Sequence, residues 1–597
     1  MLPTGLLLGL LWTVASPATA DGGLFVDRAD EVGLDFVHWN GMSGRWYFPE
    51  INGSGAALFD ADGDGDLDLY FAQGAHLGSG DPVAPPKKRG DRLYRNDLRI
   101  LPDGSRQLAF TDVTGASGLA AEPYPSDYGM AVATGDFDND GRVDLYVANY
   151  GANRLWRNLG GMRFEEVAGA WRAGDRRWSS TAVAVDVDRD GWLDLYVGNY
   201  LKFDPATQRP CSISTGQRDY CHPSTYPPEP DLLLLNTGAS GRPGFVDASS
   251  TALPDRGRFP TLGAVAADLD GDGWADLYVA NDDTPNQLWR NLGPKATKGG
   301  ATKGGATEVE EVPGAVTFVE DALLAGSAVN GRGKAEASMG IDAGDADGDG
   351  DLDLFMTHLD GQTNTLFAND GGGTFRDVSS RSGLGPPSLA TTGFGTGFLD
   401  IENDGDLDLF AVNGAVQVME ELARNDDPFP FHQRDLLLRN RGGGVFEDIS
   451  AEGGDLHHHS AVSRGAAMGD VDNDGDTDLV VVDNHGPVRL LINTVGQDRP
   501  WIGVRLVDRR GRDALGAVAN LRSGKGPGLL RRVRTDGGYA SAHDPRIRFG
   551  LGGLGAGPRS LDVRWPDGSR ETFPAPAEGR YTMLVQGSTT AEGSAKE

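Results

Sequence analysis

Short apolar runs separated by glycine, asparagine and aspartate recur along most of the chain. The runs are rich in β-forming residues and are only about four to six residues long, which is typical of strands bounded by tight turns rather than of helices. One order of runs is repeated seven times. A run of small and apolar residues leads into an Asp-rich loop, and runs of the types DLYV, NRLWRN and F-x-D/E follow.

This repeat predicts the fold class. Units of four short strands are typical of β-propellers with four-stranded blades, so we expect an all-β protein with a seven-bladed β-propeller over residues 24–494. The seventh unit ends near residue 494 without an F-x-D run, whereas an additional run of this type, LFVD, begins at residue 24. We expect this N-terminal run to complete the last blade, because that pairing closes the ring and removes an exposed sheet edge.

The Asp-rich loops are the candidate functional sites. Each follows the pattern D-x-D-x-D-G-x-x-D-L, with glutamate at one acidic position of the sixth loop. Alternating carboxylates and a glycine at position six form a tight oxygen cage, and hard oxygen ligands in a flexible loop favour Ca²⁺. Position seven varies and is expected to bind through its backbone carbonyl. The predicted ligands of up to seven Ca²⁺ ions are Asp60, Asp62, Asp64, Asp66, Asp68, Asp136, Asp138, Asp140, Arg142, Asp144, Asp186, Asp188, Asp190, Trp192, Asp194, Asp268, Asp270, Asp272, Trp274, Asp276, Asp345, Asp347, Asp349, Asp351, Asp353, Asp400, Glu402, Asp404, Asp406, Asp408, Asp470, Asp472, Asp474, Asp476 and Asp478.

One isolated loop of this kind is also compatible with an ordinary Asp/Gly surface turn. Seven loops in phase favour cations, since each pair of carboxylates about 4 Å apart costs about 1 kcal/mol in water and about 4 kcal/mol near a protein surface. An EF-hand is excluded because it needs an acidic residue at position twelve, where the first three loops have Phe71, Val147 and Val197.

The charge distribution divides the chain into two parts. The formal net charge is −33, which predicts repulsion of nucleic acid and attraction of divalent cations. Residues 501–597 nevertheless contain 16 Lys and Arg against 10 Asp and Glu, so a basic segment follows a very acidic one. Its alternating runs, such as WIGVRLV and SLDVRW, predict a small β-rich domain at 501–587, followed by a disordered tail at 588–597.

The N-terminus and the cysteines both indicate secretion. Residues 5–15 are apolar but too short to span a bilayer, and small residues precede position 21, so we expect a signal peptide at 1–20 and no transmembrane segment. An apolar N-terminal strand is the alternative. The chain is expected outside the cell, in the periplasm or at the cell surface. Cys211 and Cys221 are expected to form a disulfide there, with two free thiols as the alternative.

The repeats resemble FG-GAP/VCBS repeats, as in the propeller of integrin α-subunits. The segment FVHWNGMSGRWYFPEINGSGAALFDADGDGDLDLYF at 36–71 and the loop of the two cysteines are similar to the cartilage acidic protein family. Residues 501–586, with GGYASAHDPRIRFGLG at 537–552 and VRWPDG at 563–568, resemble the ASPIC/UnbV domain. The resemblance implies extracellular binding or cell adhesion, with a protein or glycan as ligand, and supplies no reaction.

A propeller enzyme or a transition-metal protein is the alternative function. His76, His358 and His485 follow the second strands of the first, fifth and seventh predicted blades, and His38 lies in the N-terminal segment. They could approach one another near the central channel, where a histidine cluster could bind a transition metal. Unrelated loop histidines explain the same pattern. No catalytic residue is assigned, and the UnbV likeness alone leaves an accessory role in secondary metabolism open. The tract at 457–459 is expected to be a solvated surface, and the low-complexity stretch at 295–311 a flexible insertion.

Overall fold

The computed structural model describes residues 23–588, except 81–82, 121–126, 214–215, 255, 295–315, 426, 525–527 and 555–558. The predicted signal peptide, the low-complexity insertion and residues 589–597 of the predicted tail lie outside the described residues. The described chain is mostly β, and most of its strands belong to four-stranded antiparallel sheets. Helices in this part of the chain are all too short or too polar to cross a membrane.

Seven of the four-stranded sheets contain one Asp-rich loop each, between their first and second strands, and are numbered here as sheets 1 to 7 in chain order. Their strands are β2 (Ala56–Phe59), β3 (Asp68–Phe71), β4 (Arg92–Asn96) and β7 (Phe110–Asp112); β8 (Tyr128–Gly135), β9 (Asp144–Tyr150), β10 (Arg154–Asn158) and β11 (Phe164–Glu166); β12 (Ser179–Val185), β13 (Asp194–Asn199), β16 (Leu232–Asn236) and β17 (Phe245–Asp247); β18 (Thr261–Ala267), β19 (Asp276–Asn281), β20 (Gln287–Pro294) and β21 (Val316–Glu320); β22 (Ile341–Gly344), β23 (Asp353–Met356), β24 (Thr365–Asn369) and β25 (Phe375–Asp377); β26 (Gly393–Leu399), β27 (Asp408–Asn413), β29 (Leu436–Asn440) and β30 (Phe446–Asp448); and β32 (Ser463–Gly469), β33 (Asp478–Asp483), β34 (Val488–Asn493) and β1 (Phe25–Asp27).

The last of these sheets joins the two ends of the repeat region. Its outer strand β1 pairs antiparallel with β34, so that Phe25 lies opposite Asn493 and Asp27 lies opposite Leu491. The expected pairing of the N-terminal F-x-D run with the seventh unit is therefore confirmed. The pairing covers the edge of β34 that would otherwise be free.

The first strands of sheets 1 to 7 contact one another in a closed cycle. Each contacts the first strand of the next sheet, and β32 of sheet 7 contacts β2 of sheet 1. Separate hydrophobic clusters fill the spaces between neighbouring sheets, such as the one that joins Leu58 and Leu69 of sheet 1 to Val480 and Leu490 of sheet 7. Because each sheet is covered on both faces, its second strand is buried along almost its whole length.

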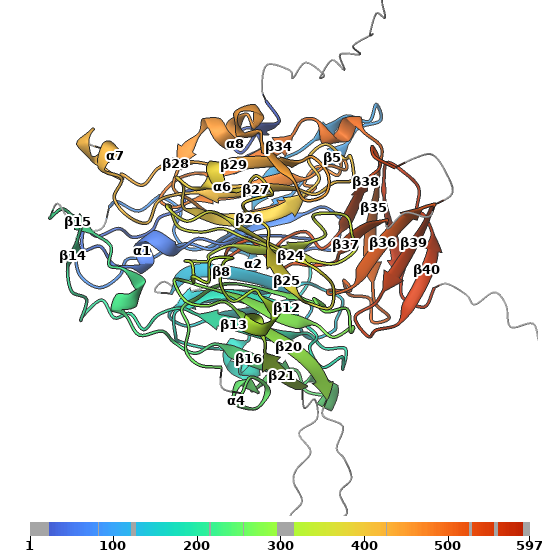
Figure 1. The fold of residues 1–597 in the computed structure, drawn as a ribbon, viewed down its shortest axis with the longest axis horizontal. Helices are drawn as coiled ribbons and strands as arrows, with labels where there is room; N and C mark the ends of the chain where they lie inside the picture. Colours follow the sequence, from blue (N-terminus) through green and yellow to red (C-terminus); the bar gives the residue numbers. More distant parts are fainter. Residues whose placement is uncertain are drawn as a thin grey trace, which may run out of the picture.

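Short elements connect these sheets. The helices are α1 (Pro49–Asn52), α2 (Thr114–Ser117), α3 (Ala168–Trp171), α4 (Ser249–Ala252), α5 (Ala322–Ala325), α6 (Gly385–Ser388), α7 (Glu420–Arg424) and α8 (Asp455–His458), with 3₁₀ turns at Pro223–Thr225, Gly238–Ser240, Ser450–Glu452 and Gly496–Asp498. Two-stranded pairs are β5 (Arg99–Ile100) with β6 (Arg106–Gln107), β14 (Cys211–Ser212) with β15 (Arg218–Asp219), and β28 (Gln433–Arg434) with β31 (Ser460–Ala461). Figure 1 shows α7, β14 and β15 on the side of the sheets opposite the C-terminal strands.

The C-terminal residues form two sheets beside the repeat region (Figure 1). A three-stranded sheet has the order β38 (Ile547–Gly550), β35 (Trp501–Val507) and β41 (Tyr581–Val585). A four-stranded sheet has the order β37 (Leu529–Arg532), β36 (Val518–Ser523), β39 (Arg559–Arg564) and β40 (Arg570–Pro574). These strands and the described segments that connect them are together called the C-terminal domain below.

One segment of the C-terminal domain, residues 534–544, inserts among the first strands of the repeat sheets. The backbone N–H groups of Leu58, Val132 and Ile341, from three different sheets, donate to carbonyls of this segment at 3.0–3.1 Å. The approach is so close that a Cβ on Gly55 would lie 2.1 Å from the carbonyl oxygen of Ala540. The segment lies in the GGYASAHD motif, so this motif is where the C-terminal domain enters the centre of the cycle of sheets.

Candidate metal-binding loops

All seven Asp-rich loops have the same backbone shape. The residues at positions four and six have positive φ values, as in the first loop with Gly63 at 83° and Gly65 at 95°. Position six is always glycine, as the sequence indicated. Position four is glycine, asparagine or arginine, and asparagine tolerates this left-handed conformation better than most residues. The second left-handed position was not recognised in the sequence, although its Gly/Asn bias was a signal.

The carboxylate at position one closes the turn. In six loops it accepts a hydrogen bond from the N–H of the position-six glycine at 2.8–3.2 Å. The position-five carboxylate accepts from the N–H of position seven, for example from Asp66 to Asp64 at 2.9 Å and from Trp192 to Asp190 at 2.8 Å. These bonds fix the carboxylates on the inner side of the loop.

The carboxylates at positions one, three and nine converge. In each of the first five loops, one oxygen from each of these three residues lies within 4.8 Å of the other two. Several buried carboxylate oxygens also lack any hydrogen-bond partner among the described residues. They are Asp62 Oδ1, Asp138 Oδ1, Asp186 Oδ1, Glu402 Oε2 and Asp476 Oδ1. Converging oxygens without donors are the environment that a hard cation such as Ca²⁺ fits.

The position-nine aspartate is the most deeply buried carboxylate in the first six loops, and in the seventh loop it is as deeply buried as Asp470 at position one. In all seven loops it accepts from the N–H of position two and from the N–H of an asparagine at or near the end of the third strand, at 2.7–3.0 Å. Burial nevertheless raises the pKa of Asp68 and of Asp353 to about 8, and that of Asp276 to about 7. A nearby divalent cation would reverse this effect because it favours the ionised form.

The same asparagines link neighbouring sheets. The side-chain Nδ2 of each donates to the position-two carbonyl of the preceding sheet's loop at 2.8–2.9 Å, and the asparagine of sheet 1 donates to the loop of sheet 7. The asparagines are Asn96, Asn158, Asn236, Asn291, Asn369, Asn440 and Asn493. The geometry of each loop is therefore coupled to its neighbour around the whole cycle.

The C-terminal domain covers the loops with basic side chains. Arg505 lies 3.4 Å from Asp60, Arg512 lies 3.8 Å from Asp186, and Arg531 lies 3.9 Å from Asp400. Arg564 forms an ion pair with Asp268, and the hydroxyl of Tyr581 donates to Asp470 at 2.8 Å. Five position-one aspartates thus have a partner in the C-terminal domain. The opposite charges of the two parts of the chain, visible in the sequence, meet at this interface.

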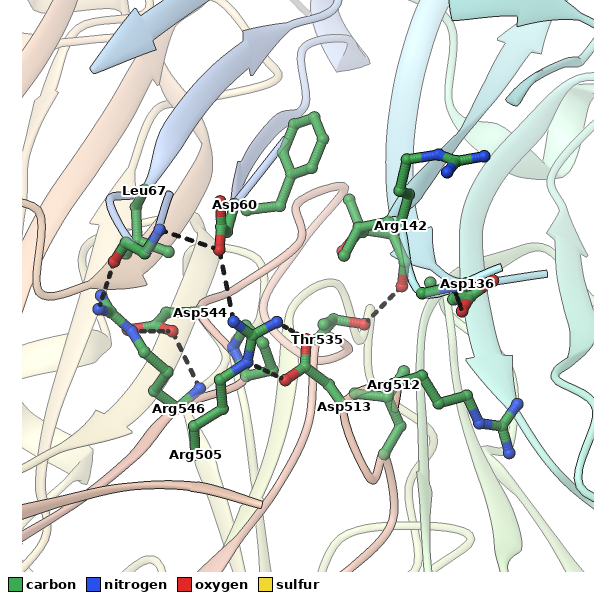
Figure 2. Close-up of a pocket in the computed structure, with 18 of the residues that line it drawn as sticks. Asp60, Leu67, Asp136, Arg142, Arg505, Arg512, Asp513, Thr535, Asp544 and Arg546 are labelled. Atoms are coloured by element: carbon green, nitrogen blue, oxygen red, sulfur yellow. Dashed lines mark hydrogen bonds and ion pairs between the residues drawn. The ribbon is translucent and has the colours of Figure 1, made fainter. Parts of the chain in front are cut away.

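A cavity of about 310 Å³ lies between the first two loops and the C-terminal domain (Figure 2). Its charged groups pair with one another. Arg505 binds Asp513 at 2.7 Å as well as Asp60, and Arg546 binds Asp544 at 2.9 Å. The cavity therefore has few free polar groups.

The predicted histidine site is divided between two places. The Nδ1 of His38 accepts from the backbone N–H of His485 at 3.2 Å, and burial lowers the pKa of His38 to about 3. His358 instead contacts Ser338 at 3.1 Å and Glu336 at 3.7 Å. His76 is exposed. Among the described residues, contacts thus bring together two of the four predicted histidines, His38 and His485. In the separate tract at 457–459, His457 hydrogen-bonds the carbonyl of Asp435.

Cys211 and Cys221 form a disulfide, as expected. It closes the β14–β15 pair within the long connection of sheet 3. Val418 belongs to the long connection of sheet 6, and its N–H donates to Asp219 of this pair at 3.1 Å. Trp46, from the segment before sheet 1, contacts the ring of Tyr220 beside the disulfide. Three distant segments therefore meet on the side remote from the C-terminal domain.

Comparison with protein families agrees with the repeat and with the C-terminal domain. Residues 136–197 and 345–411 match the FG-GAP-like repeat, and residues 507–591 match the family described as ASPIC and UnbV. The chain carries FG-GAP-like repeats and an ASPIC and UnbV domain. It is also 24% identical to cartilage acidic protein 1 of Xenopus tropicalis over 80% of this chain and 76% of that protein. The same identity is found with the Mus musculus protein over 84% and 82%.

Solved structures give only weak overlaps. An Agrocybe aegerita lectin that recognises non-reducing terminal N-acetylglucosamine is 16% identical, with a TM-score of 0.35 over 74% of this chain and 88% of the lectin. The exotype rhamnogalacturonan lyase YesX is 11% identical, with a TM-score of 0.31 over 92% of this chain and 91% of the lyase.

Proposed function

We propose that the chain is a secreted, seven-bladed β-propeller over residues 24–494, loaded with up to seven Ca²⁺ ions and followed by a β domain at 501–587, and that it acts as an extracellular interaction module. The observation that carries the calcium proposal is the set of buried carboxylate oxygens that converge without donors. Converging oxygens occur in the first five loops, and unpaired buried oxygens occur in the sixth and seventh as well. Each loop thus shows converging carboxylate oxygens, an unpaired buried carboxylate oxygen, or both.

Calcium fits the donor set better than a soft metal does. The acidic side chains of the loops offer only oxygen, and hard oxygen donors in a flexible loop favour Ca²⁺ over transition metals. Positions one, three, five and nine would supply carboxylates, and position seven its backbone carbonyl. One oxygen of the position-five carboxylate accepts from the N–H of position seven, and the other oxygen would bind the cation. The cations would then hold together a turn whose carboxylates otherwise repel one another.

Seven blades are supported by two closed cycles. One consists of the contacts between first strands, and the other of the seven asparagine side chains that each bind the preceding loop. Both return from the seventh sheet to the first. A ring of this kind leaves no unpaired sheet edge at its junction.

The extracellular assignment is supported by the disulfide and by the likeness to cartilage acidic protein 1. A disulfide persists in an oxidising compartment. The partner would be a protein or a glycan. Recovery of the chain from culture medium with a mature N-terminus at residue 21 would agree with secretion, whereas retention of residues 1–20 in a cytosolic form would contradict it. A pull-down from the native medium with and without calcium would identify the partner.

The calcium proposal is tested by counting bound ions in matched variants. In Asp347→Asn, the position-three residue of the fifth loop loses its charge but keeps the oxygen that accepts from the N–H of Asp349. We expect isothermal titration to find one calcium ion fewer per chain. Asp30→Asn removes an exposed aspartate outside the loops and should leave the count unchanged. Equal calcium counts in Asp347→Asn and the original chain would contradict the assignment.

A further inference from the structure

A second cavity, of about 260 Å³, lies between the third Asp-rich loop and the C-terminal domain. Its walls are formed by residues 186–191 on one side and by 508–512, 566–567 and Gln586 on the other. Four arginines line it: Arg189, Arg509, Arg510 and Arg512. We call it the arginine cleft. Two of these arginines have guanidinium nitrogens without a hydrogen-bond partner among the described residues.

Two of the arginines have buried nitrogens without a partner. Arg512 is only 7% exposed, and its Nε donates to Asp508 at 2.7 Å, but its Nη1 has no hydrogen-bond partner among the described residues. The Nη2 of Arg189 is likewise buried and unpaired in this part of the chain. Arg509 is exposed and makes no ion pair with any described residue. The guanidinium of Arg189 also lies over the ring of Trp274, 3.8 Å from its centre. The guanidinium of Arg510 already donates to the backbone carbonyls of Asp190 and Gly191. Free donors for a ligand therefore remain on Arg512, Arg189 and Arg509.

Arg512 points into the cleft. Figure 2 shows its side chain extending away from the Arg505–Asp513 pair. Its Nη2 is 3.8 Å from Asp186, a residue that lines the arginine cleft but not the larger cavity. Arg512 and Arg189 thus line the same cleft.

Four aspartates also line the cleft, Asp186, Asp190, Asp508 and Asp567, so they equal the arginines in number. Most of them are already engaged within the protein. Asp190, the position-five residue of the third loop, accepts from the N–H of Trp192 at 2.8 Å. Asp508 accepts from Arg512 and from the N–H of Arg510, and Asp567 accepts from Ser569 and Gln586. Asp186 is the exception, because one of its oxygens is buried and unpaired. It is also the position-one residue of a loop proposed to hold calcium. With the cation in place, the free groups of the cleft are donors.

We propose that the arginine cleft binds an oxyanion, in the form of the sulfate or carboxylate group of an acidic saccharide or as the free anion. Planar guanidinium groups recognise such groups through paired, charge-assisted hydrogen bonds. A buried cationic donor without an acceptor is costly, so a ligand that supplies the acceptor gains affinity. The inference extends the proposed interaction module by naming a ligand class and a site.

The test is calorimetric titration of the calcium-saturated full chain, at constant ionic strength, with inorganic sulfate, a sulfated disaccharide and the same disaccharide without sulfate. We expect the sulfated disaccharide to bind and the unsulfated one not to bind. Inorganic sulfate shows whether the ligand is the free anion or an acidic saccharide. An affinity equal to that of the sulfated disaccharide indicates the free anion, and a lower affinity indicates a saccharide. Absence of binding by both sulfate-bearing probes would overturn the proposal.

The variants separate a specific site from general attraction. Arg509→Gln changes an exposed residue and therefore leaves the fold intact, whereas Arg512 also binds Asp508 within the protein. We expect Arg509→Gln to weaken binding about tenfold, the loss of one charged hydrogen-bond donor. Arg163→Gln, at an exposed arginine on sheet 2, should leave binding unchanged. Equal weakening by both variants would contradict the site. The calcium count is measured separately, so failure here would leave the calcium proposal standing.

Discussion

The asparagine links between sheets lead to a quantitative prediction for Asn369→Ala. Asn369 is 2% exposed and joins three groups: its Nδ2 donates to the carbonyls of Leu269 at 2.9 Å and Leu352 at 3.2 Å, and its Oδ1 accepts from the N–H of Gly371 at 3.1 Å. The bond to Leu269 crosses from sheet 5 to the loop of sheet 4. Alanine removes all three bonds and leaves their partners behind.

The expected loss follows from the number of bonds. A typical hydrogen bond contributes about 0.5–1.5 kcal/mol net, and a buried partner left unsatisfied costs about 1–3 kcal/mol. Three bonds in a buried turn therefore predict that Asn369→Ala lowers the free energy of unfolding by about 3 kcal/mol. Asn369→Asp should be at least as destabilising, because the carboxylate keeps the size but removes both donated bonds.

The assay is urea unfolding in saturating calcium, followed by tryptophan fluorescence and by circular dichroism. The two transitions must coincide for the free energy to be defined. Asn425→Ala, at an exposed asparagine, is the matched control and should change stability by less than about 0.5 kcal/mol. If Asn369→Ala were no more destabilising than this control, the inter-sheet bonds would not stabilise the ring as argued.

Three further outcomes are expected. Arg546→Gln removes contacts with Asp544 and with the first and seventh loops. It should therefore lower the melting temperature and expose the C-terminal domain to limited proteolysis. The control Arg522→Gln, at an exposed ion pair, should do neither. Cys221→Ser should cost about 2–3 kcal/mol because the disulfide closes a ten-residue separation, and unchanged urea unfolding would contradict this. Burial lowers the pKa of His358 to about 3, below its unfolded value of about 6.5, so the folded protein loses stability as the pH drops below about 6.5. Between pH 7 and pH 5, His358→Asn should therefore lose about 2 kcal/mol less of its free energy of unfolding than the original chain. Equal losses in the two proteins would contradict this prediction.

Strands and loops could be predicted from the sequence because their signals are local. The D-x-D-x-D-G-x-x-D-L pattern located every loop, and glycine at position six has the positive φ that the turn requires. The pairing of β1 with β34 was predictable because the repeat itself showed which strand was absent from the seventh unit. Local periodicity was sufficient in each case.

Contacts between sheets were harder to predict. The asparagine at the end of each third strand recurs visibly, but its partner lies in the preceding repeat, and nothing local identifies it. The charge difference between residues 501–597 and the rest was visible in the sequence, but nothing local indicated that Arg505 or Arg531 would meet the loops. The histidines could not be grouped from sequence, because the neighbours of His358 are Ser338 and Glu336 while those of His38 come from the last sheet.

Metal analysis of the secreted protein tests the central claim most directly. The native protein would be dialysed exhaustively against metal-free buffer, and its metals counted by mass spectrometry, before and after treatment with a strong chelator. We predict several calcium ions per chain, up to seven, no stoichiometric transition metal, and a sharp fall in melting temperature on chelation that added calcium reverses. Protein that retained its full melting temperature without calcium, or that held stoichiometric copper, iron or zinc instead, would contradict the account.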